Sequence, residues 1–435
     1  MKNDYSQLLI DIQKKSRITV QNVKDVKNLR DEIESGVNSN IGYNTMRRLF
    51  GFLPKTVPSF ATLSLLSNYL GFTSYAYYLN NKLNFDEWYF QQKLINFQLN
   101  KQIDTEVVAT IEVGLTNKNN IVAVANLMSH YIRQNNIDVL HFLFKTIKFP
   151  KLTDGESLKF ATIVTYNLLT IEKSTALNIY KKLLPIDNFR NLIPLFYIDY
   201  SNLTSIYGEV LGLIKQVSNQ SSDLLFVDLM FYYKSFFQNE TISNSKIITL
   251  PKNYNSFHDV LKGRYLAYLI LKSNTIDEGL EKHILTELKN NQVSLISQEV
   301  IAALIIKEEY ELLIIIFEKY YEDIFENVSW TYKTTNTINL IGLANVNWHQ
   351  QKYSSAKKNL DLVELDKVEL GYYDYFSLFF YLTQLKISYS EKDQKLNLNA
   401  QMQIKKYISK TNFQFFEQLA NKFKIKTSTN LKAIN

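Results

Sequence analysis

The sequence contains no cysteine, and only 12 of its 435 residues are glycine and 6 are proline. The absence of cysteine excludes disulfide bonds, thiolate metal sites and cysteine nucleophiles, and it favours a reducing cytoplasm as the location. Glycine and proline supply the turns of β-sheets and the flexibility of phosphate-binding loops. Their scarcity therefore predicts an all-α fold in which helices are joined by short polar turns.

Long apolar segments are also absent. Runs such as residues 312–317 are far shorter than the roughly 20 residues that a membrane-spanning helix requires. Residues 1–7 contain acidic and amide side chains where a signal peptide would carry its apolar core. We expect a cytoplasmic protein without a membrane partner.

Motifs of catalysis and nucleotide binding are missing as well. The sequence has no G-x-x-x-x-G-K-[ST] or G-x-G-x-x-G loop and no G-x-S-x-G elbow. Its five histidines form no H-E-x-x-H motif and no closely spaced pair. We therefore predict a non-enzyme with no catalytic residue, no metal ligand and no cofactor. An enzyme whose histidines converge with a carboxylate only in the folded chain remains a weaker alternative.

Charge is distributed unevenly along the chain. The formal net charge is +7, made up of +5 in residues 1–82, −5 in residues 83–385 and +7 in residues 386–435. A basic amino-terminal segment before an acidic body is consistent with phosphate contact at one end of the protein. The basic carboxy-terminal segment is more simply explained as the solvated face of a lysine-rich helix.

Helical spacing of apolar residues runs through the first 80 residues. Residues 5–15 form one amphipathic pattern, and a second begins after a possible N-cap at Thr19 or Asn22. We expect Gly36 to end this second helix and residues 38–40 to form a polar turn. The next helix should span residues 43–50 and bury Met46, Leu49 and Phe50.

A proline-bracketed loop then leads into a further helix. Ser59 is placed to cap it, Leu63 and Leu66 repeat at the spacing of a buried face, and Gly71 should end it. Ser74 should begin one last short helix of this module.

This part of the chain resembles a known DNA-binding fold. The residues that carry the resemblance are Gly51, Pro58, Ser59, Thr62, Leu63, Leu66, Leu70 and Gly71. Over about 50 residues they are similar to the second half of the Cro-type, lambda-repressor-like helix-turn-helix domain. The helix before the turn lacks the family's usual small residue, and Leu49-Phe50 replace a charged pair. The resemblance implies that residues 1–82 bind double-stranded DNA and that the helix ending at Gly51 lies in the major groove.

The resemblance also selects candidate site residues. Arg47 and Arg48 would reach phosphates or guanine edges, and polar residues at the start of their helix would lie near bases. Backbone amides at the next helix start would hold phosphates. The predicted DNA-contacting residues are Asn40, Tyr43, Asn44, Arg47, Arg48, Lys55 and Ser59. The alternative is a small helical module whose arginines are merely exposed, and in either case we expect their replacement hardly to affect folding.

Residues 83–435 consist of amphipathic patterns of about 12–18 residues without a Pro- or Gly-rich linker. Residues 173–185 and 343–363 resemble the helices of tetratricopeptide hairpins, with a small residue such as Ala356 where the partner helix approaches. No strict 34-residue period persists. We predict a degenerate tetratricopeptide-like superhelix with a possible internal break near residues 239–255, and another loop near residues 388–394.

Aromatic residues make up 14% of the chain and occur in runs at residues 231–233, 236–237 and 372–376. Such runs would line a concave peptide-binding face, or they would interdigitate between packed hairpins. We favour the packing interpretation.

The predicted architecture is similar to that of the peptide-pheromone receptors of Gram-positive bacteria, in which a helix-turn-helix domain precedes a repeat array. This similarity implies a homodimeric DNA-binding transcriptional regulator whose repeat domain binds a peptide or protein. The alternative is a non-enzymatic interaction scaffold whose helix-turn-helix module contacts protein rather than DNA.

Overall fold

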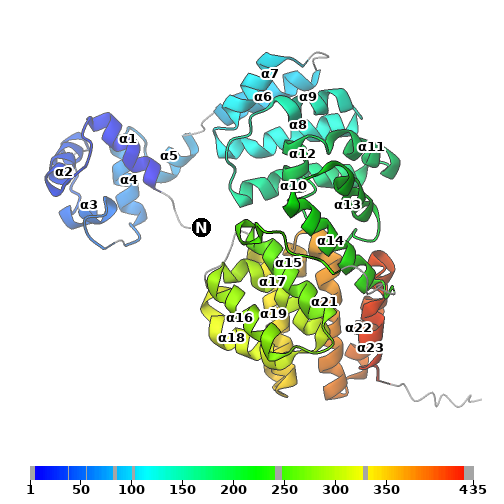
Figure 1. Ribbon diagram of the computed structural model, residues 1–435. Coiled ribbons are helices and arrows are strands. Elements are labelled where there is room, and N and C mark those ends of the chain that lie inside the picture. The colour runs from blue at the N-terminus through cyan, green and yellow to red at the C-terminus, as the bar shows by residue number, and fades with distance from the viewer. Residues whose placement is uncertain are drawn as a thin grey trace, which may run out of the picture. The chain divides into compact units, whose positions relative to one another are not determined.

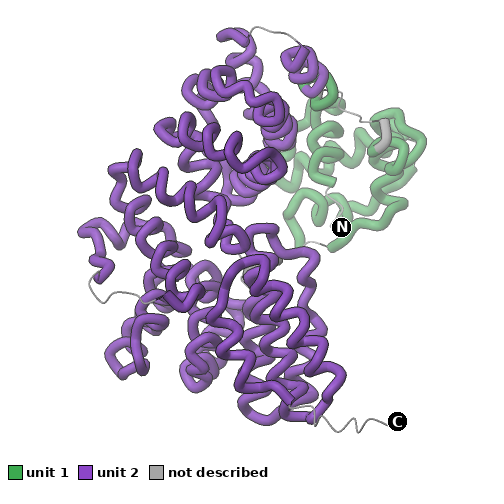
Figure 2. The backbone as a smooth tube through the Cα atoms, turned by 90° about the vertical axis from the view of Figure 1, so that its right-hand side faces the viewer, with its two compact units in different colours: residues 1–90 green, residues 91–435 purple. Residues whose placement is uncertain are grey.

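The computed structural model describes residues 5–37, 39–54, 56–81, 86–99, 103–240, 247–326 and 332–425. In these ranges the regular secondary structure is entirely helical, with 23 α-helices, three short 3-10 helices and no strand (Figure 1). The all-α prediction is therefore confirmed. The chain divides into two compact units, residues 1–90 and 91–435, and the division falls inside α6 (Figure 2). None of the described helices combines the length and hydropathy needed to cross a bilayer.

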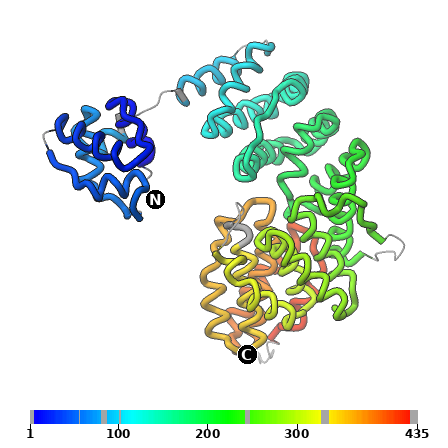
Figure 3. The backbone as a smooth tube through the Cα atoms, turned by 60° about the vertical axis from the view of Figure 1, so that its left-hand side comes forward, coloured from blue at the N-terminus to red at the C-terminus, as the bar shows by residue number. Residues whose placement is uncertain are grey.

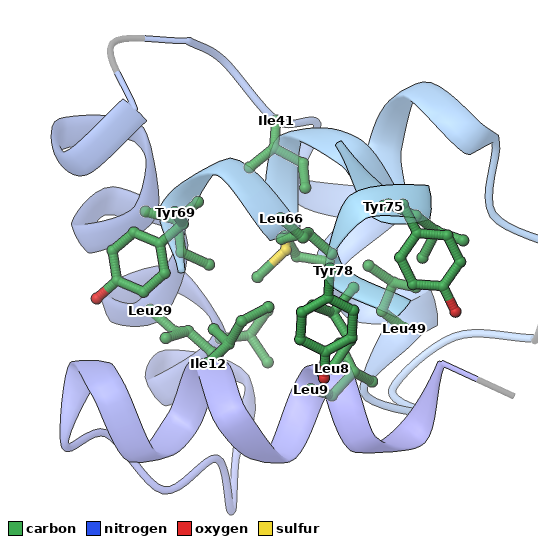
Figure 4. Packing of buried hydrophobic residues seen from close by; sticks show 14 residues of the cluster. Leu8, Leu9, Ile12, Leu29, Ile41, Leu49, Leu66, Tyr69, Tyr75 and Tyr78 are labelled. Atoms are coloured by element: carbon green, nitrogen blue, oxygen red, sulfur yellow. The ribbon is translucent and has the colours of Figure 1, made fainter. Parts of the chain in front are cut away.

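Unit 1 is a small bundle around one core (Figure 4). Its helices are α1 (Ser6–Ser16), α2 (Val23–Val37), α3 (Tyr43–Leu49), α4 (Phe60–Tyr69), α5 (Tyr75–Asn81) and the beginning of α6 (Asp86–Leu99). The core residues repeat at the three- and four-residue spacing that marks one face of a helix. They include Leu8, Leu9, Ile12, Val26, Leu29, Ile33, Met46, Leu49, Leu63 and Leu66, all buried. Tyr75 and Tyr78 complete this core from α5.

Two predicted helix caps are present in unit 1. The Asn22 side chain accepts hydrogen bonds from the amides of Lys24 and Asp25 at 2.9 and 3.1 Å, so Asn22 rather than Thr19 caps α2. The Asp25 carboxylate in turn accepts the Asn22 amide at 3.0 Å. Ser59 caps α4 by accepting the Thr62 amide at 3.2 Å. These bonds satisfy amides that have no partner within the helix.

The prediction that Gly36 ends α2 is wrong, because the helix continues to Val37. A Cβ atom at Gly36 would lie only 2.9 Å from the ring of Tyr69. Glycine is needed here so that α4 can approach α2, not to terminate the helix. Gly51 and Gly71, by contrast, have φ angles of +80° and +99° and do follow the ends of α3 and α4.

The first part of unit 2 is a two-layer array of helices. Its helices after α6 are α7 (Thr105–Gly114), α8 (Ile121–Arg133), α9 (Ile137–Thr146), α10 (Asp154–Thr170), α11 (Lys173–Leu183), α12 (Asp187–Leu192), α13 (Ile206–Val217) and α14 (Ser221–Phe237). Helices α8 and α10 pack together in one layer, and α9, α11 and α13 pack in succession in the other. Ala176, Tyr180 and Leu183 of α11 are buried, as their spacing predicted.

The second part continues with hairpins around a central row. Its helices are α15 (Asp259–Lys272), α16 (Glu278–Asn290), α17 (Val293–Lys307), α18 (Tyr310–Phe325), α19 (Tyr332–His349), α20 (Tyr353–Asp361), α21 (Leu370–Glu391), α22 (Gln394–Thr411) and α23 (Phe415–Asn421). Helices α15, α17, α19 and α21 are successive neighbours and form the inner row. Every residue of α17 from Val293 to Ile306 is buried, which explains why its sequence is apolar on all sides.

Residues 194–205, between α12 and α13, cover one face of this inner row. The Tyr200 hydroxyl donates to the Glu299 carboxylate of α17 at 2.7 Å, and its ring stacks on Tyr375 of α21 at 4.5 Å. The Ser201 amide donates to the Gly371 carbonyl at 2.8 Å. A Cβ atom at Gly371 would lie 2.2 Å from a carbonyl of this segment, so only glycine permits the approach.

The carboxy-terminal part of the chain also packs against helices that lie far from it in the sequence. Phe413 stacks with Phe237 of α14 at 4.7 Å, and α23 packs against α14 and α21 (Figure 3). Tyr233, Phe237 and Tyr375 from the predicted aromatic runs are buried in this contact, which confirms the packing interpretation for them. A linear array, in which each repeat touches only its neighbours, would not contain such contacts.

The two predicted loops have different outcomes. Residues 239–240 and 247–253 contain no helix, and residues 254–256 form a 3-10 turn, whereas residues 241–246 lie outside the described residues. Of the loop predicted near residues 388–394, only Lys392 and Asp393 connect two helices, because α21 extends to Glu391 and α22 begins at Gln394. Ser388 is buried inside α21, where its hydroxyl accepts a hydrogen bond from the side-chain nitrogen of Asn397 at 3.1 Å. Its polarity is thus satisfied in the interior rather than by solvent.

Candidate nucleic-acid interface

Helix α3 of unit 1 presents one polar face to solvent. Its inner face buries Met46 and Leu49, and Asn44 on the opposite side is exposed. Arg48 lies one turn after Asn44 on the same stripe, and Asn40 is exposed in the turn before the helix. Arg48 is in the last helical turn, where the helix dipole favours a cation. Asn40, Asn44 and Arg48 are the predicted site residues that the structure leaves accessible around α3.

Tyr43 differs from its prediction as an outer-face residue. It is half-buried, and its hydroxyl donates to the carbonyl of Val23 at 3.1 Å. The guanidinium groups of Arg30 and Arg47 lie 5.6 and 5.8 Å from its ring centroid. Tyr43 therefore fastens the start of α3 to the start of α2, and its hydroxyl is already engaged.

The expectation that both arginines are fully exposed is also wrong. Arg47 and Arg48 are both half-buried, and Nε of Arg47 is completely buried without a hydrogen-bond partner. The reason is the four-residue spacing to Tyr43, which places the Arg47 side chain over the tyrosine ring. Arg47 is consequently part of the packing between α2 and α3, whereas Arg48 keeps the role of a surface cation.

Acidic side chains of α2 lie close to this arrangement. Arg30 contacts Asp31 at 2.9 Å and Glu34 at 3.5 Å. The Glu34 carboxylate also accepts the Ile41 amide at 2.8 Å, which holds the turn before α3. The spacing of Arg30 and Glu34 is a sequence signal for a helical ion pair, but their link to the α2–α3 turn depends on the fold.

Two cations that the sequence interpretation did not select lie near α3. Lys24 and Lys27 are exposed in the first half of α2, next to Val23, to which Tyr43 is bonded. These two exposed lysines add positive charge to the surface at the start of α2.

The loop between α3 and α4 has a mixed character. Ser59 is exposed, but its hydroxyl is used as the helix cap, and predicted Lys55 lies outside the described residues. Val57 and Phe60 beside the cap are 90% and 57% exposed. This surface is as suited to contact with protein as with a phosphate.

The described residues provide no candidate metal centre. No group of three His, Cys, Asp or Glu side chains in these ranges is placed to hold a metal ion. His349 pairs with Glu311 at 3.2 Å on the surface. Burial and the nearby Arg133 lower the pKa of His130, which packs edge-on against Tyr131.

No protein-family model, curated protein or solved structure matches the chain.

Proposed function

We propose that the protein is a DNA-binding transcriptional regulator in which unit 1 contacts double-stranded DNA. The observation that supports this best is the polar stripe of Asn40, Asn44 and Arg48 on a short helix anchored by α2. In this proposal α3 enters the major groove, where asparagine and arginine recognise adenine and guanine edges. Lys24 and Lys27 bind phosphates of the backbone.

Unit 2 is proposed to bind a peptide or protein partner and to mediate homodimerisation. The face of its inner row that residues 194–205 cover is already occupied by the chain itself, so the partner binds elsewhere on the helical array. A homodimer would present two α3 helices to half-sites spaced by about one turn of DNA or a multiple of it. Sedimentation equilibrium of the full chain tests the dimer, and a monomer at all concentrations would contradict it.

A salt titration of duplex binding tests the DNA contact. The affinity of the full chain for promoter and random fragments should fall steeply with salt, with a slope of about −0.9 for each phosphate contacted. Arg48→Ala should reduce that slope by about one if it contacts a phosphate, or relax base preference at one position if it contacts a base. Asn44→Ala should relax base preference with little change in slope.

The matched control is Lys14→Ala, which removes the same charge from an exposed position on α1. Figure 4 shows α1 on the opposite side of the core from Ile41, which lies two residues before the start of α3. Equal effects of Lys14→Ala and Arg48→Ala would indicate nonspecific attraction and contradict the assignment of α3.

A protein-interaction scaffold is the second candidate. It is favoured by the exposed Val57 and Phe60 and by the acidic Asp31 and Glu34 next to α3. This alternative predicts no duplex binding even at low salt. It also predicts loss of a protein partner in Phe60→Ser, a substitution that leaves the cations of unit 1 unchanged.

A further inference from the structure

Unit 2 contains a cavity of about 270 Å³ at the point where three helices begin. The amino-terminal turns of α14, α15 and α21 meet there, beside α10, α17 and the segment of residues 195–198. The lining residues used below are Leu158, Leu195, Asp223, Arg264, Glu369 and Tyr372. Neither the sequence motifs nor the proposed DNA contact involves this cavity.

The walls of the cavity are mainly apolar and partly open to solvent. Leu158 of α10 and Leu195 of the covering segment are half-buried, and Phe226 of α14 is buried behind them. A cavity of roughly 150 Å³ with similar walls accommodates benzene in another protein. The present volume therefore accommodates a molecule of about two fused rings, or an aliphatic body of equivalent size.

The Arg264 guanidinium in the lining is paired within the protein. Arg264 is 3% exposed, its Nη2 donates to the Tyr372 hydroxyl at 2.9 Å, and the same nitrogen lies 2.9 Å from the Glu299 carboxylate. Nε of Arg264 and Oε1 of Glu299 make no hydrogen bond, but both atoms are inaccessible to a water-sized molecule and cannot be reached from the cavity. The Arg264 charge is thus balanced by Glu299 rather than left for a ligand.

The charges around the cavity are nearly balanced. Arg264 is paired with Glu299, and Asp223 is paired with Arg190 at 3.1 Å. Glu369 precedes the first turn of α21, where its negative charge is offset by the partial positive charge of the helix start. A ligand with a full positive or negative charge would lose its hydration here without gaining an unpaired counter-ion. An uncharged ligand loses less.

We propose that this cavity binds an uncharged, mainly apolar small molecule of about two-ring size. Such a ligand contacts α10, α14, α15, α21 and residues 195–198 together, and so stabilises the segment that covers the inner helix row. The proposal is independent of whether unit 1 binds DNA.

The test uses four probes of one shape with the full-length chain. Acetylnaphthalene and naphthalene are uncharged, naphthoate adds a negative charge and naphthylmethylamine adds a positive charge. Isothermal titration should show acetylnaphthalene and naphthalene each binding at least about tenfold more tightly than either charged probe. Equal binding of all four, preference for a charged probe, or no binding of either uncharged probe would overturn the proposal.

Variants locate the binding site. Leu158→Trp and Leu195→Trp fill the cavity from two different segments, and both positions are half-buried, so the larger ring has access to solvent. Each should lower the affinity for acetylnaphthalene at least about tenfold. The matched control is Leu398→Trp on α22, where the leucine is 55% exposed. Undiminished affinity in a folded cavity variant, or an equal loss in the control, would place the ligand elsewhere and contradict the proposal. The wild-type preference among the probes decides the matter even if both cavity variants unfold.

Discussion

Lys386 of α21 is a buried cation, and its replacement should change how stability depends on pH. The side chain is 1% exposed, and Nζ donates to the Tyr310 hydroxyl at 2.8 Å and to the Asn345 side-chain oxygen at 3.0 Å. The ring centroids of Tyr310 and Trp348 lie 5.3 and 5.4 Å from Nζ. Burial lowers the pKa of Lys386 from 10.5 to about 8, although Glu308 raises it and Lys422 lowers it further.

The lowered pKa sets the direction of the effect. At pH values between the folded and unfolded pKa the unfolded chain binds the proton and the folded chain does not, so stability increases with pH. The whole interval corresponds to about 3 kcal/mol, and the part between about pH 7 and pH 9.5 corresponds to about 2 kcal/mol. Buried tyrosines such as Tyr200, whose pKa is raised by burial and by Glu299, act in the opposite direction as the pH approaches about 10. They do so in wild type and in a Lys386 variant alike, so the difference between the two proteins isolates the lysine.

Urea unfolding of unit 2 across this pH range provides the assay, followed by circular dichroism and tryptophan fluorescence. From about pH 7 to about pH 9.5 the free energy of unfolding of wild type should increase by about 2 kcal/mol relative to that of Lys386→Met. At a fixed pH the substitution has two opposing effects on the free energy of unfolding. It removes a buried charge, but it leaves the Tyr310 hydroxyl and the Asn345 oxygen without their donor.

The matched control is Lys395→Met, since Lys395 is exposed on α22. This variant should show the same pH dependence as wild type. The reasoning about Lys386 would be refuted if Lys386→Met showed that dependence too.

Three further substitutions test the packing described above. Arg47→Ala should lower the free energy of unfolding of unit 1 by about 1 kcal/mol, and with it the melting temperature, because it uncovers a tyrosine ring that the guanidinium covers. An unchanged melting curve would show that this arginine is merely exposed. Gly36→Ala should destabilise unit 1 by about 1–3 kcal/mol, because the added methyl group overlaps the Tyr69 ring of α4. Ser35→Ala at the exposed neighbouring position should not, and equal melting temperatures of the two variants would contradict the close approach. Tyr200→Phe should lower the free energy of unfolding of unit 2, measured by chemical denaturation, by about 1–3 kcal/mol, because the buried carboxylate on α17 loses a donor. Tyr389 is half-exposed, so Tyr389→Phe is the control, and equal losses in both variants would show that the buried hydroxyl has no special role.

In unit 1 the local order of helices was predictable from the sequence, but the roles of individual polar residues were not. Helical spacing identifies Met46, Leu49, Leu63 and Leu66 as core residues, because burial of one stripe depends only on the 3.6-residue period. The same spacing indicates that Asn44 lies on the outer face. It does not reveal that Tyr43 bonds to the carbonyl of a residue 20 positions earlier.

Arg47 illustrates the same limit. The periodicity of α3 alone puts Arg47 on the solvent-facing side of the helix, and only the approach of α2 brings Tyr43 and the guanidinium groups together. Gly36 is a second case, since a glycine near a predicted helix end resembles a terminator until the position of the Tyr69 ring is known. Both errors arise because packing between helices determines the surroundings of a side chain, whereas periodicity determines only its direction on its own helix.

The sequence by itself determined the all-helical class of the chain and the buried face of α11 in unit 2. Composition, periodicity and caps act within about four residues, so they leave a readable signal along the chain. The tertiary structure decided the rest. Residues 194–205 cover the inner row through contacts with residues about 170 positions later, and the cavity exists because the starts of α14, α15 and α21 converge. Contacts over such separations depend on how helix faces fit together, and no local pattern in the sequence encodes that fit.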